Sequence, residues 1–254
     1  MKPTAKSFAR LLSSGSLVRY MCWRLTGRRN AIALRLAGGP MILLRPPRVD
    51  NNDYGVAYEI FVYRYYDCPR ALPADRISRI VDLGANVGFS CLHWLTHFPR
   101  AEVIALEPHP GHFAQCRANL AANAMLKRVE LHQAAAGTAF RQIRLSDAGT
   151  SSSVMADADG GIEAEMVDLF ALLAGRRVDL MKLDIEGGEY PILDDPRFAA
   201  LQVPYLVMEW HGGPADRDRC LARFGALNYE TLELFDNGSY GMLWAFRRAP
   251  AAAG

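Results

Sequence analysis

The sequence predicts an α/β fold with a mainly parallel, Rossmann-like sheet, an antiparallel C-terminal hairpin and a helical, basic N-terminal extension. Three observations lead to this prediction. From Arg79 onward, short apolar segments alternate with segments of helical length, as expected for a sheet covered on both faces. The first apolar segment ends in a glycine-rich turn that opens a helix. Near the end of the chain, strand-like segments flank Asn237-Gly238, a dipeptide that favours a tight hairpin turn.

The first fifty residues come before the sheet and carry a distinct charge. Residues 1–49 contain ten Lys or Arg residues and no Asp or Glu, although the net charge of the whole chain is only +2. One or two helices are expected over the first forty residues, and the Gly38-Gly39-Pro40 break then leads into a strand over 41–44. The predicted parts are this extension (1–50), one globular domain (51–249, with its core over 75–215) and a frayed tail (250–254).

The basic extension has two interpretations. It is either an amphipathic segment that docks on an anionic membrane surface or partner, or a helix that caps the globular domain. Arg10, Arg19 and Arg24 interrupt its apolar residues, which argues against a secretory signal. The apolar runs are too short to cross a membrane, and the five cysteines lack a zinc or disulfide spacing. We therefore expect a cytoplasmic protein, with peripheral contact at the inner face of the membrane through residues 1–40.

The elements of the globular domain follow in order. An aromatic-rich stretch over 54–66 has the spacing of one helical face, which we interpret as packing rather than as a substrate wall. A polar stretch over 141–165 predicts a strand excursion and a loop near the site. The strands of the sheet are expected over 80–83, 103–107, 129–133, 180–184 and 205–210, and those of the hairpin over 230–235 and 241–246.

The turn after the first strand has the features of a nucleoside-binding turn. Asp82 lies at the strand end, Gly84 and Gly88 let a ligand approach the backbone, and free amides at the start of the next helix attract negative charge. Glu107 ends the second strand, where a carboxylate accepts hydrogen bonds from both hydroxyls of an adenosine ribose. The order of strand, turn, helix, strand and terminal acid therefore predicts a nucleoside cofactor rather than a purely structural turn.

Two departures from the dinucleotide pattern indicate which nucleoside is bound. Asn86 replaces the middle glycine that lets a pyrophosphate approach the backbone. Asp82 would repel phosphate, yet its carboxylate suits the ammonium group of a methionine moiety, directly or through water. The sequence therefore favours S-adenosylmethionine over a nicotinamide cofactor, and it also lacks a Tyr-x-x-x-Lys pair.

Acidic residues and a histidine follow the next two strands. Asp184 and Glu186 come directly after one strand, at the edge where open α/β sheets bind ligands. A functional role is predicted for Asp184, whereas Glu186 suits either the site or a helix cap, and Glu189 is assigned to the helix start. Lys182 is expected to pair with one of these acids, because an unpaired buried ammonium is expensive. His211 ends the neighbouring strand and is the best candidate for a general base, although a histidine hydrogen-bonded at a loop start explains it equally well.

These motifs resemble those of the FkbM-type methyltransferases. The resemblance rests on Asp82-Leu-Gly-Ala-Asn-Val-Gly88, on Leu106-Glu107-Pro108-His109-Pro110 and on Lys182-Leu-Asp-Ile-Glu-Gly-Gly-Glu189, which occur in order within residues 75–215. It implies a class I methyltransferase sheet of the Rossmann-like type and S-adenosylmethionine as the methyl donor. The basic extension lies outside the resemblance.

The resemblance also implies roles for individual residues. Asp184 and Glu186 would lie near the transferred methyl group. Asp168, in Met166-Val-Asp-Leu169, stands where the family has a Leu-Asp pair and is added to the cofactor set. The other implied cofactor contacts are Asp82, Gly84, Asn86, Gly88, Glu107 and Pro108.

The reaction expected from the resemblance is O-methylation of a hydroxyl on a sugar, a glycan or a secondary metabolite. Transfer in line depends on alignment in a dry site, and His211, Asp184 or Glu186 would accept the proton. A divalent cation held by the carboxylates is an alternative, but the sequence shows no complete ligand set, and no metal is predicted. His93 and His97 have metal-site spacing without the glutamate of H-E-x-x-H, and we interpret them as ordinary packing or surface residues.

Parts of the sequence are also compatible with two other classes of function. A NAD-dependent oxidoreductase is permitted by Glu107 but disfavoured by Asn86. A non-catalytic, methyltransferase-like binding module would act on RNA or at a membrane through the basic extension. The chain lacks an Asn-Pro-Pro-Tyr type of base pocket after its fourth strand, so nucleic acid is not the expected partner.

Overall fold

The structure is a computed structural model in which residues 8–27, 29–48, 51–145, 154–155 and 161–248 are described. The predicted tail over 250–254 lies outside these residues. The helices are α2 (Ser14–Leu25), α3 (Asp53–Phe61), α4 (Phe89–His97), α5 (Pro110–Ala122), η1 (Leu126–Arg128), α6 (Leu169–Leu172), α7 (Glu189–Asp194), α8 (Phe198–Leu201) and α9 (Pro214–Ala226). The strands are β1 (Ile32–Arg35), β2 (Met41–Leu44), β3 (Arg79–Leu83), β4 (Glu102–Leu106), β5 (Val129–His132), β6 (Ala135–Gly137), β7 (Arg141–Leu145), β8 (Val154–Met155), β9 (Ile162–Asp168), β10 (Leu180–Leu183), β11 (Tyr205–His211), β12 (Tyr229–Asp236) and β13 (Tyr240–Arg247).

The central sheet has seven strands in the order β12-β13-β11-β10-β3-β4-β5. The five strands from β11 to β5 pair in parallel, and β13 runs antiparallel to both of its neighbours. Every predicted strand of the sheet and its hairpin is present within one residue of the expected ends. The structure therefore confirms the predicted fold class.

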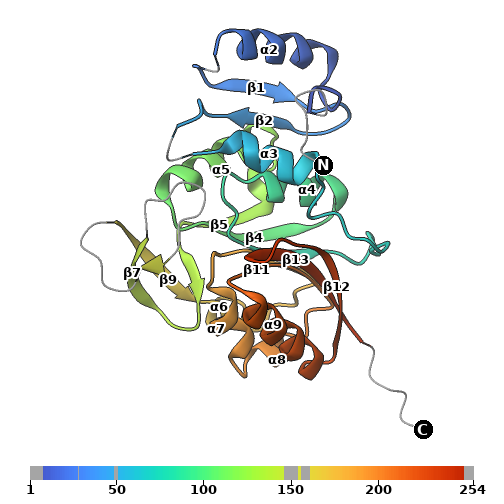
Figure 1. Ribbon diagram of the computed structural model, residues 1–254, viewed down its shortest axis with the longest axis vertical. Coiled ribbons are helices and arrows are strands. Elements are labelled where there is room, and N and C mark those ends of the chain that lie inside the picture. The colour runs from blue at the N-terminus through green and yellow to red at the C-terminus, as the bar shows by residue number, and fades with distance from the viewer. Residues whose placement is uncertain (1–7, 28, 49–50, 146–153, 156–160, 249–254) are drawn as a thin grey trace.

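Helices cover both faces of this sheet, as Figure 1 shows, with α3, α4 and α5 on one face and α6 to α9 on the other. Successive side chains of a strand point to opposite faces, so each strand contributes to two cores. Ile80 and its register partner Leu180 pack under α4, whereas Val81 and Met181 belong to the core beneath α6 to α9. This double burial explains why the strands appear as continuous apolar runs in the sequence.

The N-terminal extension contains a small sheet as well as a helix. β1 and β2 pair antiparallel, and Gly38 in the turn between them has a φ of +67°. β2 was predicted, but β1 was not. Asn119 of α5 and Asn123, which directly follows that helix, accept hydrogen bonds from the backbone N–H groups of Leu43 and Met41, both at 2.7 Å. The extension thus lies as a further layer on the helices of one face, at one end of the molecule (Figure 1).

A second, four-stranded sheet in the order β6-β9-β7-β8 lies beside the central one. It contains the predicted strand excursion, as β7 and β9, and residues 146–153 and 156–160 of the predicted loop lie outside the described part of the chain. Among the helices that the structure describes, none is long and apolar enough to span a membrane.

Candidate active site

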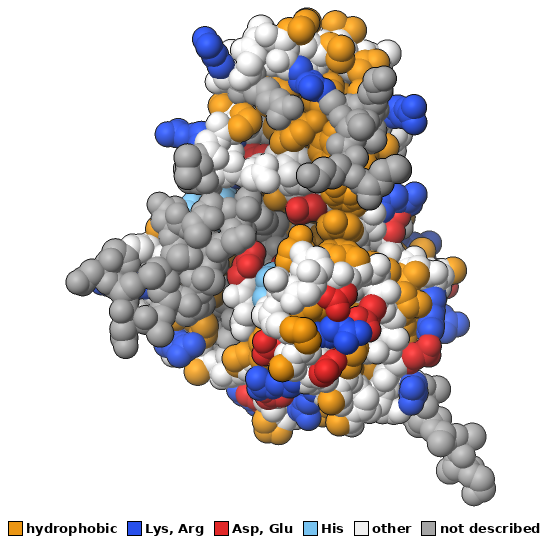
Figure 2. Space-filling model, viewed as in Figure 1, with side chains coloured by type: hydrophobic (Ala, Val, Ile, Leu, Met, Phe, Trp, Pro, Cys, Tyr) orange, Lys and Arg blue, Asp and Glu red, His pale blue; other side chains and the backbone are white. Residues whose placement is uncertain are grey.

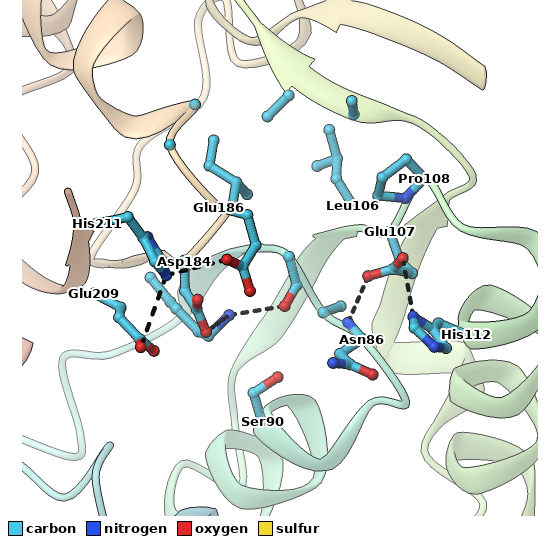
Figure 3. Close-up of a pocket in the computed structure, with 18 of the residues that line it drawn as sticks. Asn86, Ser90, Leu106, Glu107, Pro108, His112, Asp184, Glu186, Glu209 and His211 are labelled. Atoms are coloured by element: carbon cyan, nitrogen blue, oxygen red, sulfur yellow. Dashed lines mark hydrogen bonds and ion pairs between the residues drawn. The ribbon is translucent and has the colours of Figure 1, made fainter. Parts of the chain in front are cut away.

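A cavity of about 540 Å³ lies at the carboxyl ends of the central strands, within the size range of small-molecule sites. The chain continues from β3 to β4 and β5 on one side of the sheet, and from β10 to β11 on the other. The ends of β3 and β10 therefore border the crevice in which open α/β sheets bind ligands. Figure 3 shows that the cavity has two ends, one with Glu107 and His112 and the other with Asp184, Glu186, Glu209 and His211.

The turn after β3 separates these two ends and depends on its glycines. Gly84 has a φ of +79°, and a Cβ at this position would overlap the backbone oxygen of Asp184. Only glycine therefore allows the turn to approach the loop after β10 so closely. Gly88 has a φ of +83° and directly precedes α4. It packs against Cys116 and is not among the residues that line the cavity.

Glu107 is buried at the end of β4, and backbone groups hold its carboxylate in place. Its Oε2 accepts a hydrogen bond from the N–H of Asn86 and its Oε1 accepts one from the N–H of His109, both at 2.8 Å. Burial raises the pKa of Glu107 to about 7, although these two hydrogen bonds act in the opposite direction. Nδ1 of His112 also lies 3.8 Å from Oε1 (Figure 3). A carboxylate offers about four lone-pair sites, so Glu107 can still accept further hydrogen bonds from a ligand.

Asn86 and Pro108 complete this end of the cavity. Within the described part of the chain, Oδ1 of Asn86 is buried and has no hydrogen-bond partner. A buried, unpaired amide oxygen costs free energy that a ligand donor would recover. The residues present at this end therefore fit an adenosine group, with Glu107 facing the ribose hydroxyls and Asn86 offering a further acceptor.

The other end of the cavity is organised by a buried lysine. Nζ of Lys182 lies 3.2 Å from Oδ2 of Asp184 and 3.4 Å from Oδ1 of Asp82, and it donates hydrogen bonds to the backbone oxygens of Leu83 (3.1 Å) and Gly84 (2.8 Å). The expected pairing of Lys182 with an acid is confirmed. Burial alone would lower its pKa, but the two carboxylates outweigh burial and raise it, so the ammonium stays charged. Asp82 itself is fully buried and does not line the cavity.

Asp184 is held between Lys182 and a tyrosine. The hydroxyl of Tyr66 donates a hydrogen bond of 2.6 Å to Oδ2 of Asp184. Burial acts to raise the pKa of Asp184, but the Lys182 ammonium and the Tyr66 hydroxyl lower it overall. Asp184 is therefore ionised and pairs with the Lys182 ammonium, and its low pKa makes it a weak base.

His211 lies among carboxylates from the loop after β10, from the start of α7 and from β11 itself. Its Nε2 is 3.4 Å from Glu186 and 3.8 Å from Glu209 (Figure 3). Its Nδ1 is 3.3 Å from Glu189. Burial acts to lower the pKa of His211, but Glu189, Glu186 and Asp184 together raise it to about 9. In the free protein at neutral pH, His211 is therefore mainly an imidazolium.

Glu189 is fully buried, and its two oxygens accept hydrogen bonds from the N–H groups of Ile185 (2.7 Å) and Gly187 (2.9 Å). These bonds shape the loop that carries Glu186, whose φ is +55°. The assignment of Glu189 to the start of the next helix agrees with this position, because it is the first residue of α7.

The sequence analysis assigns no role in the site to Tyr66, Glu59 or Glu209. Tyr66 contacts Asp184, while Glu59 and Glu209 line the cavity beside it. Burial and the charge of Asp184 raise the pKa of Glu209 to about 9 and that of Glu59 to about 7. The aromatic stretch is the available signal, but its spacing predicts a single helical face over 54–66. That interpretation is wrong in extent, because α3 ends at Phe61 and Tyr66 reaches the cavity from the following loop.

The structure does not bring Asp168 to the cavity. Its Oδ1 accepts hydrogen bonds from the N–H groups of Phe170 (2.9 Å) and Ala171 (3.3 Å), and its Oδ2 pairs with Arg197 at 2.8 Å. Asp168 thus caps α6, and the cofactor role implied for it finds no contact in this geometry.

His93 and His97 lie on α4, beside Asp67. These three residues offer metal-ligand atoms that lie within 4.8 Å of one another. Arg64 already pairs with Asp67, and His93 is buried. The cavity contains a second group of this kind, formed by Asp184, Glu209 and His211.

Comparison with known proteins identifies a family. A model of the methyltransferase FkbM domain matches residues 82–240, which is more than half of the chain. A comparison with curated proteins finds no match.

Solved structures provide further similarities. An FkbM methyltransferase from Methylobacillus flagellatus KT superposes with a TM-score of 0.52 at 14% identity, over 95% of this chain and 57% of that one. This chain thus spans little more than half the length of that protein, and the likeness concerns the fold alone. A precorrin-6y C5,15-methyltransferase from Geobacter metallireducens GS-15 has a TM-score of 0.44 at 14% identity, over 69% of this chain and 84% of that one. An O-methyltransferase family protein from Burkholderia thailandensis has a TM-score of 0.46 at 13% identity, over 76% and 57%.

Proposed function

The chain belongs to the FkbM methyltransferase family, and from this premise we propose that it methylates a hydroxyl group of a sugar, a glycan or a secondary metabolite. Methyl transfer from S-adenosylmethionine is the chemistry of the family, so the predicted cofactor is confirmed and the NAD-dependent alternative is set aside. Two points remain our proposal: the methyl group goes to an oxygen atom, and the acceptor is a sugar, a glycan or a secondary metabolite.

The observation that supports this function best is the arrangement of one cavity with two different ends. Glu107 and Asn86 at one end suit the adenosine group of the cofactor. Asp184 and Glu186 at the other end supply negative charge for its cationic part. His211 lies beside them, and its neutral imidazole would accept a proton where transfer takes place.

Methylation of a hydroxyl releases a proton, and we assign His211 as the group that accepts it. Asp184 is a weaker candidate, because Lys182 and Tyr66 lower its pKa. In the free protein the pKa of His211 is about 9, so the imidazole is mainly protonated at neutral pH. A further positive charge beside Asp184 and Glu186 lowers that pKa. The sulfonium of a bound S-adenosylmethionine would supply such a charge beside Asp184 and Glu186, so His211 would lose its proton more readily in the complex than in the free protein.

The wall around the reacting end suits an acceptor rich in hydroxyl groups. Glu59 and Glu209 face the cavity next to Tyr66 and Tyr240. Carboxylates accept hydrogen bonds from hydroxyls, and the raised pKa of Glu209, about 9, leaves it protonated and able to donate one at neutral pH. These groups favour a sugar-like acceptor over an apolar one.

A direct test uses S-adenosylmethionine with a labelled methyl group and a panel of sugars, glycans and hydroxylated metabolites, with matched amines beside them. The label should move to a hydroxyl and resist alkaline hydrolysis, as a methyl ether does and a methyl ester does not. We expect His211→Asn to lower kcat by about 10²- to 10⁴-fold, the usual contribution of a general base. His132→Asn is the matched control, because His132 pairs with Glu130 outside the cavity and should leave kcat unchanged.

Three results would contradict the proposal. Label found only on amines would identify a different acceptor atom. Cofactor binding without transfer to any acceptor would favour a non-catalytic binding module. Loss of transfer on chelation, with recovery on adding Mg²⁺, would indicate that Asp184, Glu209 and His211 hold a cation rather than accept a proton.

A further inference from the structure

The outward face of α2 is apolar, although it lies on the surface of the protein. Leu17, Val18, Met21 and Leu25 are 37%, 65%, 51% and 84% exposed. At 3.6 residues per turn these four side chains fall within an arc of about 100°. The residues of α2 that are buried, Ser16, Tyr20 and Trp23, lie on the opposite side and pack toward the rest of the molecule. The apolar face is therefore not needed for the packing of α2 itself.

This concentration of exposed apolar side chains is unusual within the molecule. Seven large hydrophobic residues are exposed in the described part of the chain, and four of them lie on this one helix. Surface helices normally present polar residues to solvent, and a contiguous apolar patch marks an interaction surface.

Exposed basic residues accompany the apolar face on the same helix. Arg24 lies about 20° beyond Leu17, at one edge of the stripe, whereas Arg19 is exposed about 100° beyond Val18, away from the other edge. None of the ion pairs found among the described residues involves either of them. Figure 2 shows blue Lys and Arg side chains spread over the upper part of the molecule, with orange hydrophobic side chains between them. Figure 1 identifies this part as α2, β1 and β2, which belong to a segment of 49 residues without any Asp or Glu.

We propose that the outward face of α2 docks this protein onto an anionic lipid surface. An apolar stripe with an arginine at one edge, on a helix and a segment that carry only basic charge, matches the boundary between acyl chains and acidic headgroups, where apolar side chains insert and guanidinium groups meet phosphate. A second copy of the chain is the less suitable occupant. In a two-fold contact through α2, the arginines of both copies would approach each other, and residues 1–49 offer no acidic side chain to separate them.

The position of α2 permits docking without blocking the site. In Figure 1 this helix is the outermost element at one end of the molecule, with the β1–β2 pair between it and the layer that contains α3. The cavity is lined by α3 and by the ends of the central strands, and α2 contributes no residue to it. The membrane would therefore hold the enzyme near lipid-linked or membrane-associated acceptors while the cavity stays open.

The test is co-sedimentation of the full-length protein with vesicles of neutral phosphatidylcholine alone or with about 30% phosphatidylglycerol. The protein should bind the anionic vesicles and bind neutral ones at least about tenfold less tightly. Replacing Val18, Met21 and Leu25 together by Ser should weaken binding to anionic vesicles by at least about tenfold, and so should Arg19→Glu with Arg24→Glu. Phe140→Ser is the control, because Phe140 is 69% exposed but lies far from α2 in the sequence, between β6 and β7.

Binding of S-adenosylmethionine, measured on each variant, shows that the fold is retained. Three outcomes would overturn the proposal: no binding of the wild-type protein to anionic vesicles, the same loss with Phe140→Ser, or wild-type binding by the triple Ser variant. Self-association that the triple Ser variant abolishes, with no vesicle binding at any stage, would assign the face to a contact between two copies.

Discussion

The role of Glu107 is tested by changing its carboxylate to an amide. In Glu107→Gln the side chain keeps its size, but one carboxylate oxygen becomes an NH2 group, which donates and cannot accept. One ribose hydroxyl would lose its acceptor and the other would meet a neutral oxygen. A hydrogen bond to a charged group contributes about 1.5–3 kcal/mol and a neutral one about 0.5–1.5 kcal/mol, so the lost bond and the weakened bond together cost at least about 2–3 kcal/mol. We therefore expect the Kd for S-adenosylmethionine to rise by about 30- to 150-fold, measured by calorimetric titration. Glu102→Gln is the control, at the exposed start of the same strand.

The pH dependence of this binding gives a second readout of the same group. Burial raises the pKa of Glu107 to about 7 in the free protein, and hydrogen bonds from ribose hydroxyls favour its ionised form. Affinity should therefore increase as the pH rises from about 5.5 to 7.5, by about tenfold, and this increase should be absent in Glu107→Gln. For the unliganded protein the sign is opposite, because a folded-state pKa above the unfolded value gives stability at low pH that is lost as the pH rises through 7. A Kd that changes less than about threefold in Glu107→Gln, with the pH dependence retained, would refute the ribose assignment.

Three further predictions concern other groups of the site and its turn. Lys182→Met should lower the free energy of unfolding by about 3–5 kcal/mol in urea titrations, because two buried carboxylates lose their cation; a loss below about 1 kcal/mol would contradict this. The pKa of His211, followed by NMR and assigned with His211→Asn, should be about 9 in the free protein and lower with S-adenosylmethionine than with the uncharged-sulfur product S-adenosylhomocysteine. Equal pKa values of His211 in the two complexes would contradict the proposed coupling between cofactor charge and the protonation of His211. Gly84→Ala should destabilise the fold far more than Gly175→Ala in thermal melts, because both have positive φ but only at Gly84 would a Cβ meet backbone; similar Tm values would show that the close approach is not required.

The parts of the fold and site that the sequence predicted are those encoded within short segments. The glycine turn, Glu107 and the acids after β10 each follow directly from an apolar strand, so their place at the carboxyl edge is set by local order. Lys182 was likewise expected to need an acidic partner, since a buried ammonium without one is costly.

Contacts between distant segments were harder to predict. Tyr66 reaches Asp184 across 118 residues, and no local pattern distinguishes it from the aromatic residues that only pack. β1 was missed because its four residues are strand-like only through pairing with β2. The raised pKa of His211 depends on carboxylates from the loop after β10, so its charge in the free protein was not predictable from its position at a strand end. Asp168 ends a strand as Glu107 does, but the neighbouring Arg197 and the start of α6 take both of its oxygens.

The central claim is that S-adenosylmethionine lies in this cavity with its ribose at Glu107 and its reacting centre at the end formed by Asp184, Glu186 and His211. A crystal structure of the complex with S-adenosylhomocysteine tests it most directly. The account predicts that both ribose hydroxyls donate hydrogen bonds to Glu107 and that the sulfur faces the His211 end. A ligand bound in the reverse direction, or outside this cavity, would contradict the assignment of both ends.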